Sequence, residues 1–365
     1  MKVCVITTVH SPGDIRIRKE LETLHRGGHE VHFVAPEGDF SLAEISYMRI
    51  ARVEGRLKRF LRSSKDALKI ARSINADVYH FHDPELIPLG LKLKKAGKKV
   101  IYDIHEEYPS VILMKNWIPR LFRSLVSRFA DWYERRAVCK FDGIVVVVPE
   151  QLERFPVARR FAILPNYPNV ERLKPKRRTS SDGVLRFVYS GSIDIDRSIV
   201  EMIQAFRLVR KTHNVELNLL GPIFDPELKR LILGSENAAD DGLHYKGFLP
   251  YEEALDSVAQ NDIGLMVMHR GRSKEMSSPL KMFEYLTLGL PIIASDFKKW
   301  HDVLDEKRCA LFVDPDSAED IAEKMELLIT NKELRSQMRD NAIEISSKYT
   351  WKSVEGRLLE LYRSL

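Results

Sequence analysis

Residues 78–104, VYHFHDPELIPLGLKLKKAGKKVIYDI, contain a strand, a helix and a second strand, and this unit decides the fold class. Val78–His82 and Lys99–Ile104 are short apolar runs rich in aromatic and β-branched residues, which predicts two buried strands. The stretch between them has helical spacing. Because strands that alternate with helices form parallel sheets, the sequence predicts an α/β fold.

The same alternation continues along the whole chain. A helix is expected over Ile15–Arg26, where Gly27 and Gly28 supply a C-terminal stop signal. Further strands are expected at Lys2–Thr8, Glu30–Ala35, Gly143–Val148, Leu185–Tyr189, Val215–Leu220, Ile263–Met268, Pro291–Ala294 and Leu311–Val313.

The length of 365 residues favours two domains, because one domain usually takes about 150 residues. Near residue 165 the apolar periodicity stops, and a stretch rich in proline and polar residues follows, as in an exposed connection. We therefore predict one doubly wound domain over residues 1–168 and another over 169–345. Ligands of such sheets bind at the carboxyl ends of the strands, so two facing domains would hold a ligand in the cleft between them.

The composition excludes several classes of protein. Apolar residues make up 44% and charged residues 30%, which rules out fibrous and disordered chains. Cys4, Cys139 and Cys309 are too far apart for a disulfide framework or a local metal site, which points to a reducing compartment. The opening apolar run is too short for a signal peptide, and no run reaches the roughly 20 residues of a membrane span. We expect a cytoplasmic protein, at most peripheral at the inner face of the membrane.

Two stretches of the second half could bind phosphate. In Ser277–Leu286 the sequence predicts a helix with Ser278 as N-cap and Pro279 as its first residue, ending near Gly289. Lys281 then lies in the first turn, where a bound anion would be stabilised by the ammonium, the free N–H groups and the helix dipole. The alternative is a solvated lysine on a short helix.

The second stretch runs from Ser190 to Arg197. Gly191 follows a strand and lets the backbone approach a ligand, and the Arg197 guanidinium can bind two phosphate oxygens. A glycine that only serves the turn geometry is the alternative.

Imidazoles and carboxylates gather at the ends of two strands of the first half. Alternation places His80 and His82 on one face of a strand that ends at Asp83, and His105 and Glu106 follow the next strand. Such groups act as general acids or bases, or bind hydroxyl groups, and we assign His82, Asp83 and Glu106 to the acceptor side. Their spacing does not specify a metal site, so no metal ligand is assigned. Caps and core histidines are the alternative.

Residues 117–136 predict a basic amphipathic helix. Residues 1–168 hold 29 lysines and arginines against 20 acidic residues, so this half would meet an anionic partner. The helix has an apolar row at Trp117, Leu121, Leu125, Phe129 and Trp132 beside Arg120, Arg123, Arg128, Arg135 and Arg136. It either contacts an anionic membrane surface or packs on the sheet with a solvated polar face. A nucleic-acid partner is not expected, because no RNA-binding aromatic signature is present.

Blocks along nearly the whole chain resemble glycosyltransferase family 4. The matching blocks are His10–Arg16, Gly28–Val31, Val78–Leu86, Tyr102–Pro109, Leu164–Asn166, Tyr189–Ser192, Ser278–Tyr285, Gly289–Pro291 and Tyr349–Trp351. The resemblance implies the GT-B fold, two Rossmann-like domains facing across a cleft, with a C-terminal helix over residues 346–365 that returns to the first domain. It also implies transfer of a sugar from a nucleoside diphosphate to an acceptor hydroxyl with retained configuration, without metal or other cofactor.

The resemblance also implies roles for single residues. Arg197 and Lys281 match the cations that hold the donor diphosphate, Glu284 matches the acid that binds the ribose, and His105 matches the histidine that contacts the transferred sugar. Gly13, Gly191, Ser192, Ser277 and Ser278 complete the expected donor side. One departure is Met276, which stands where the family has an acid that binds the donor sugar.

Three other functions compete with transfer. A nucleotide-sugar epimerase can use the same fold, and a non-catalytic nucleotide-sugar sensor would bind the donor without turnover. A dinucleotide dehydrogenase is disfavoured because no complete G-x-G-x-x-G follows an expected strand. The expected acceptor is a glycan or a lipid-linked molecule of cell-envelope or exopolysaccharide assembly.

Overall fold

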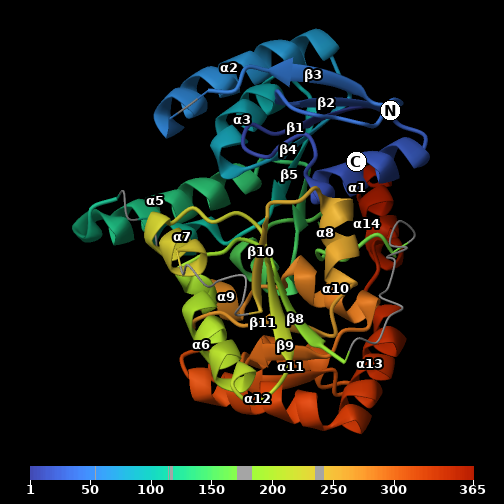
Figure 1. Ribbon diagram of the computed structural model, residues 1–365. Helices are drawn as coiled ribbons and strands as arrows, with labels where there is room; N and C mark the ends of the chain where they lie inside the picture. Colours follow the sequence, from blue (N-terminus) through green and yellow to red (C-terminus); the bar gives the residue numbers. More distant parts are fainter. Residues whose placement is uncertain (54, 114, 116–117, 171–182, 235–241) are drawn as a thin grey trace. The chain divides into compact units, whose positions relative to one another are not determined.

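The computed structural model describes the chain except residues 54, 114, 116–117, 171–182 and 235–241, and the side chains of residues 56–61 and 272–273. The chain forms two compact units (Figure 1). Unit 1 consists of Met1–Asn166 and Trp351–Leu365, and unit 2 consists of Tyr167–Thr350. Each unit is an α/β domain built on one parallel sheet.

Unit 1 is built on a seven-stranded parallel sheet with the order β3-β2-β1-β4-β5-β6-β7. Its strands are β1 Lys2–Ile6, β2 Glu30–Pro36, β3 Ser46–Ile50, β4 Val78–His82, β5 Lys99–Ile104, β6 Gly143–Val146 and β7 Phe161–Ile163. Its α-helices are α1 Ile15–Arg26, α2 Arg56–Ile74, α3 Ile87–Lys95, α4 Tyr108–Leu113, α5 Arg120–Val138 and α14 Trp351–Arg363. The strand order reverses between β1 and β4, and ligands of such sheets bind at this point.

Unit 2 repeats this plan with six parallel strands in the order β10-β9-β8-β11-β12-β13. The strands are β8 Leu185–Ser190, β9 Val215–Leu220, β10 Leu243–Gly247, β11 Ile263–Met266, β12 Ile292–Ser295 and β13 Ala310–Val313. The α-helices are α6 Ile199–Arg210, α7 Pro226–Leu233, α8 Tyr251–Val258, α9 Arg272–Glu275, α10 Leu280–Leu288, α11 Lys298–Leu304, α12 Ala318–Thr330 and α13 Lys332–Ser346. Here the order reverses between β8 and β11.

Continuous burial of the central strands explains the predicted α/β pattern. Every residue of β4 is buried, because helices cover both faces of a parallel sheet. Tyr79, Phe81 and Tyr102 fill the core on one side of the unit 1 sheet, and the Phe81 and Tyr102 rings stack with centroids 4.8 Å apart. The two-unit α/β architecture predicted from the sequence is confirmed.

The predicted elements are confirmed with small shifts at their ends, apart from one helix start. Helix α10 begins at Leu280 with Pro279 as N-cap, so the prediction that Ser278 caps the helix was wrong. Its end at Gly289, with φ 67°, is confirmed. The predicted helix over 117–136 is α5, and Trp117 lies outside the described residues. The C-terminal α14 lies beside α1 in unit 1 (Figure 1).

Candidate active site

The carboxyl edge of the unit 2 sheet brings Lys281 and Gly191 together. Gly191 directly follows β8 and has φ 138°, a conformation that residues with a side chain rarely adopt. A Cβ atom built on Gly191 would lie 2.8 Å from Nζ of Lys281. Glycine is therefore required at residue 191 for the lysine ammonium to lie against the turn after β8.

The Lys281 ammonium lies in surroundings that oppose its charge. Burial and the neighbouring Arg197 guanidinium lower the pKa of Lys281 to about 7, although Glu284 and Asp194 act in the opposite direction. Its Nζ atom lies 3.8 Å from the centroid of the Tyr189 ring, a cation–π contact. Two cations that repel each other at a helix N-terminus form a site that an anion would stabilise.

The described contacts of the Arg197 side chain in unit 2 are long. It closes the short 3-10 helix Ile195–Arg197, and its Nη1 lies 3.8 Å from Sδ of Met268. Its Nε lies 3.8 Å from a carboxylate oxygen of Asp194, and about a third of the side chain is exposed. The guanidinium therefore retains N–H groups for a bound anion.

The serines expected on the donor side use their hydroxyls within unit 2. Ser192 Oγ donates to a carboxylate oxygen of Asp194 at 3.1 Å, and Ser277 Oγ donates to the carbonyl oxygen of Lys274 at 2.6 Å. Ser278 is half-buried at the entry to α10. The two bonded hydroxyls thus shape the loops beside Lys281.

Glu284 on α10 and the preceding residues Glu275 and Met276 differ in their surroundings. Glu284 is 8% exposed, and its carboxylate raises the pKa of the buried Tyr251 hydroxyl together with desolvation. Met276 is 41% exposed. The adjacent Glu275 accepts a hydrogen bond from the Gly271 backbone N–H at 3.0 Å, so its carboxylate closes a local turn.

The carboxyl edge of the unit 1 sheet holds a charged histidine that sequence reasoning did not assign to the site. His10 lies 3.1 Å from Asp14 through Nδ1 and 3.0 Å from Asp83 through Nε2. Burial lowers its pKa, but hydrogen bonds and attraction to both carboxylates outweigh this and raise the pKa to about 10. The ring of His10 lies 4.8 Å from that of His105. His10 and Asp14 lie in the loop between β1 and α1, and this loop at the carboxyl end of a strand is the signal that could have identified them.

His105 lies beside this pair and is held by buried groups. Its Nε2 lies 3.0 Å from Nδ1 of His82 and 3.4 Å from a carboxylate oxygen of Asp103. Burial lowers the pKa of His105 to about 4, against the attraction of Asp103. At neutral pH the edge of the sheet therefore presents a charged His10 next to a neutral His105.

The other predicted unit 1 residues differ in their access to solvent. His82 is fully buried and lies beneath His105, and His80 stacks on it with ring centroids 5.0 Å apart, which confirms their shared face. Asp83 follows β4 with φ 78° and accepts a hydrogen bond from Thr7 at 2.9 Å. Glu106 is exposed. Gly13 is exposed in the turn before α1 and belongs to unit 1.

Two further aromatic residues lie at the carboxyl edge of unit 2. Phe224 follows β9 and is 78% exposed, and Phe248 follows β10 and is 74% exposed. The ends of these strands are joined by a hydrogen bond of 2.8 Å from the Gly221 N–H to the Gly247 carbonyl. Exposed aromatic rings at a ligand-binding edge are suited to stacking on a flat ring, and their position after strands was the signal available in the sequence.

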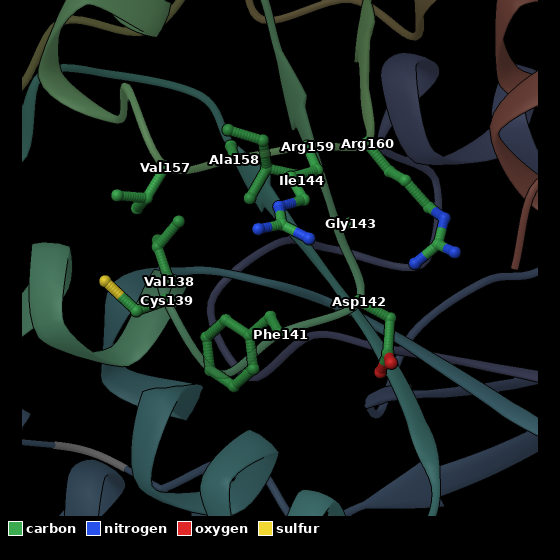
Figure 2. Close-up of a pocket in the computed structure, with 10 residues that line it drawn as sticks. All are labelled: Val138, Cys139, Phe141, Asp142, Gly143, Ile144, Val157, Ala158, Arg159 and Arg160. Atoms are coloured by element: carbon green, nitrogen blue, oxygen red, sulfur yellow. The ribbon is translucent and has the colours of Figure 1, made fainter.

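A pocket of about 380 Å³ lies at the opposite edge of the unit 1 sheet (Figure 2). Phe141, Asp142 and Gly143 line it at the start of β6, and Arg159 and Arg160 line it just before β7. These residues are at the amino ends of the strands, whereas ligands of parallel sheets bind at the carboxyl ends. We therefore do not assign this pocket to the active site.

One buried group of side chains has the chemistry of metal ligands. Glu20, His80, His82 and Asp103 are all buried, and one ligand atom from each lies within 4.8 Å of the others. Arg16 binds the Asp103 carboxylate in the same cluster, with distances of 3.1 and 3.2 Å.

Comparison with known proteins gives matches over both units. The family described as Glycosyltransferase Family 4 matches residues 15–172, and the one described as Glycosyl transferases group 1 matches residues 171–345. An alpha-D-kanosaminyltransferase of Streptomyces kanamyceticus is 22% identical over 262 residues, which is 67% of this chain and 66% of that protein. The matched region thus spans slightly less than two thirds of this relative.

Solved structures show the same fold over the full length. A sucrose-phosphate synthase from Thermosynechococcus elongatus has a TM-score of 0.76 at 16% identity, and the match covers 100% of this chain and 98% of that one. Anabaena HepE, solved in complex with UDP and glucose, has a TM-score of 0.72 at 14% identity, with 100% of both chains covered.

Proposed function

Because the chain belongs to glycosyltransferase family 4 and has the GT-B fold, we propose that it transfers a hexose from a nucleoside diphosphate to an acceptor hydroxyl with retained configuration. The pairing of Lys281 and Arg197 at the carboxyl edge of unit 2 carries this proposal. Unit 2 binds the donor, and unit 1 supplies His105 and the acceptor side. The comparisons name sugar transferases and synthases and do not favour an epimerase or a sensor.

The charges of unit 2 match the needs of this reaction. Breaking the anomeric bond leaves negative charge on the departing diphosphate, and preorganised cations stabilise that charge in the transition state. Lys281 supplies an ammonium at a helix N-terminus, and Arg197 supplies a planar guanidinium. Glu284 is assigned to the ribose hydroxyls, and Phe224 and Phe248 to the base.

We assign the neutralisation of the diphosphate to these side chains rather than to a divalent metal. A cation pair that stabilises the leaving group makes a metal ion unnecessary for that step. Turnover should then remain within about twofold when purified protein is assayed with excess EDTA. A loss of activity that Mg²⁺ or Mn²⁺ restores would contradict this assignment.

A donor screen followed by product analysis tests the main proposal. UDP-, GDP- and ADP-sugars are compared by thermal shift, because a donor at 100 times its Kd adds about 2.7 kcal/mol to the stability of the folded state. Nucleoside diphosphate release that depends on an added acceptor supports transfer. An epimerised donor formed without acceptor would identify an epimerase, and binding without any turnover would identify a sensor.

The exposed face of α5 supports a lipid-linked or membrane-bound acceptor. Leu121 is 91% exposed, Leu125 66%, Phe129 62% and Trp132 57%, and these residues recur on one face of the helix. The alternative that this row packs on the sheet was therefore wrong for the described structure. Arg120, Arg128, Arg135 and Arg136 on the same helix are exposed as well. Apolar side chains flanked by arginines match the interface of an anionic membrane.

The interior contacts of α5 explain why its apolar row faces outward. Glu134 is buried and accepts hydrogen bonds from Tyr102 at 2.8 Å and from Arg154 at 2.7 Å. Ser127 donates to the carbonyl oxygen of Pro109 at 2.8 Å. These polar contacts fix the inner face of the helix, so the leucines and aromatic residues lie on the outer face. Among the described helices, none combines the length and the apolar character needed to cross a bilayer.

Vesicle sedimentation tests the membrane surface. The protein should sediment with vesicles that contain phosphatidylglycerol at low salt, and binding should weaken in 0.5 M salt and with neutral vesicles. Each arginine near an anionic surface contributes about 1 kcal/mol, so the double variant R120Q/R128Q should bind about 30-fold more weakly. The triple variant L121S/L125S/F129S should lose vesicle binding. The control variant L208S/I343S replaces two apolar residues of unit 2 that are each 41% exposed, and it should bind vesicles as the wild type does. Unchanged binding of the triple variant would overturn the assignment.

A further inference from the structure

Four buried side chains of unit 1 converge on one point beneath His105. Glu20 on α1, His80 and His82 on β4, and Asp103 on β5 are each at most 1% exposed. One nitrogen or oxygen atom of each lies within 4.8 Å of the others. In the part of the chain that the structure describes, both carboxylate oxygens of Glu20 and the Nε2 atoms of both histidines are buried without a hydrogen-bond partner. Because buried polar atoms are nearly always paired in folded proteins, these atoms indicate a bound group that joins them.

The sheet and one helix bring these four side chains together. Alternation along β4 places His80 and His82 on the same face, where their rings stack. Asp103 is the neighbour of His82 in the parallel register of β4 and β5. Glu20 reaches the same point from α1. A His-x-His pair on one strand, with acids from the next strand and from a helix, therefore supplies two nitrogen and two oxygen donors at one place.

The separations of these atoms suit a tetrahedral metal ion. Zinc–nitrogen and zinc–oxygen bonds of about 2.0–2.2 Å place neighbouring ligand atoms about 3.3–3.6 Å apart. His82 Nε2 lies 3.8 Å from Glu20 Oε2, and His80 Nε2 lies 3.7 Å from Asp103 Oδ2. Small shifts of the carboxylates would bring these pairs to the separation that zinc requires. A proton can join only two of the four atoms, whereas one metal ion joins all of them.

The other ring nitrogens of the two histidines have outer partners. Nδ1 of His80 lies 3.0 Å from the hydroxyl oxygen of Tyr362. Nδ1 of His82 lies 3.0 Å from Nε2 of His105. Both Nε2 atoms therefore remain for a shared ligand. A histidine that binds a metal ion through one ring nitrogen usually forms a contact of this kind through the other.

The charges of the cluster permit a divalent cation. Arg16 Nη2 lies 3.1 and 3.2 Å from the two oxygens of Asp103, and Arg16 Nε lies 3.3 Å from Glu20 Oε1. Such contacts hold ligating carboxylates in place. Two carboxylates balance a divalent cation, so Arg16 leaves one positive charge in total. This is less than the two charges that remain when three neutral histidines hold zinc.

We propose that Glu20, His80, His82 and Asp103 bind one zinc ion in a closed structural site of unit 1. Zinc takes four ligands of mixed nitrogen and oxygen type, whereas calcium and magnesium prefer oxygen alone. Four buried protein ligands leave no open position for a substrate, so the ion ties α1 to β4 and β5. The inference does not rest on the proposed transfer, whose diphosphate is assigned to unit 2. An enclosed ion should exchange slowly, so turnover in EDTA still reports on a metal at the diphosphate.

Metal analysis of the purified full-length protein tests the site. The protein is expressed with added zinc, freed of any affinity tag and passed over a chelating resin. Mass spectrometry of the elements should then find about one zinc ion per chain. Glu20→Gln keeps the shape of the side chain but removes a charged ligand, and it should lose the zinc. His301→Gln removes an exposed histidine of unit 2 that contacts Asp296 and Asp305, and this control should keep the zinc.

Cobalt substitution distinguishes this site from loosely bound metal. When wild-type protein from zinc-depleted medium is titrated with CoCl₂, a four-coordinate site should give strong visible absorption that saturates near about one equivalent and disappears when zinc is added. Tyr362→Phe removes the partner of His80 Nδ1 and should weaken zinc binding about 10- to 100-fold, measured by competition with a coloured chelator, with the cobalt spectrum retained.

The wild-type measurements decide the proposal even if Glu20→Gln does not fold. Wild-type protein that is purified without zinc and shows no saturable cobalt spectrum would overturn it. A folded Glu20→Gln variant that binds zinc and cobalt as the wild type does would overturn it as well, because the metal would then lie elsewhere.

Discussion

The surroundings of the Lys281 ammonium favour the binding of an anion. Its ammonium is disfavoured by burial and by Arg197, so its pKa lies near 7 despite the opposing effect of Glu284 and Asp194. A bound diphosphate would place negative charge beside Nζ and raise the pKa again. The two adjacent cations repel each other, and a bound anion offsets this repulsion. The site therefore favours strongly anionic ligands.

Replacing Lys281 should affect turnover more than folding. Lys281→Met keeps the length of the side chain and removes its charge, and kcat should fall by about 100- to 1000-fold, the range found when one stabilising donor is removed from a transition state. Thermal unfolding should change little, because burial and the neighbouring Arg197 disfavour the ammonium in the folded protein. Steady-state assays and calorimetry measure the two effects. Lys298→Met, at an exposed residue in the first turn of α11, is the control and should behave as wild type.

His10 should make the stability of unit 1 depend on pH. Asp14 and Asp83 raise its pKa to about 10, so the charged form stabilises the folded state. This stabilisation is complete below the usual pKa of about 6.5 and is lost as the pH rises through 10. The unfolding temperature of His10→Gln should therefore lie several degrees below wild type at pH 6, with a smaller difference at pH 9. His25→Gln, on the exposed end of α1, should show no such trend, and an equal difference at both pH values would contradict the assignment.

At the scale of secondary-structure elements, the strands that could be predicted from the sequence are those buried on both faces of their sheet. Such strands, like Ile263–Met266, are continuous apolar runs between turn signals. Three strands were missed, namely Ser46–Ile50, Phe161–Ile163 and Leu243–Gly247. All three are outermost strands of their sheets. Ser46–Ile50 and Leu243–Gly247 mix polar and apolar residues, and Phe161–Ile163 has only three residues, so neither periodicity nor composition separates them from loops.

The candidate site was predictable only where local sequence carries the information. Lys281 and Gly191 were found because a helix start and a strand end have recognisable residues. Their contact was not predictable, because it joins residues that are 90 positions apart. The cluster of Glu20, His82 and Asp103 joins α1, β4 and β5 in the same way. Pairing of distant side chains depends on the sheet order, which single strands do not specify.

The turn after β8 should be intolerant of any side chain at residue 191. Gly191→Ala combines a backbone strain at φ 138° with a Cβ atom 2.8 Å from Lys281 Nζ, so Lys281 must move away from the turn. Donor affinity measured by calorimetric titration should fall at least tenfold. Gly97 has a φ of 79°, and a Cβ atom there would meet open space. Gly97→Ala is therefore a control that introduces backbone strain without a side-chain clash. It should lower the unfolding temperature without changing donor affinity, and equal affinities of both variants would contradict the contact.

At the scale of the whole molecule, the chain completes unit 1 with its last residues. Trp351 donates from its indole nitrogen to Thr23 Oγ1 at 2.9 Å, and Arg357 donates to the carbonyl oxygen of Ile163 at 3.1 Å. Leu358 and Tyr362 are buried in unit 1, and Tyr362 contacts His80 in the cluster beneath His105. The stability of the carboxyl edge of the unit 1 sheet therefore depends on residues that follow unit 2 in the sequence.

Replacing a buried leucine in one unit should consequently lower the unfolding temperature of that unit and not of the other. Leu358→Ala on α14 and Leu328→Ala on α12 both remove fully buried side chains, which costs about 2–5 kcal/mol each and lowers the unfolding temperature of the affected unit by about 4 to 20 °C. In calorimetry of the full chain, the nucleotide sugar selected by the donor screen should raise the transition of unit 2 and so identify it. Leu328→Ala should lower that transition, whereas Leu358→Ala should lower the other one, although it lies later in the sequence. If Leu358→Ala instead lowered the transition that responds to the nucleotide sugar, the assignment of α14 to the fold of unit 1 would be wrong.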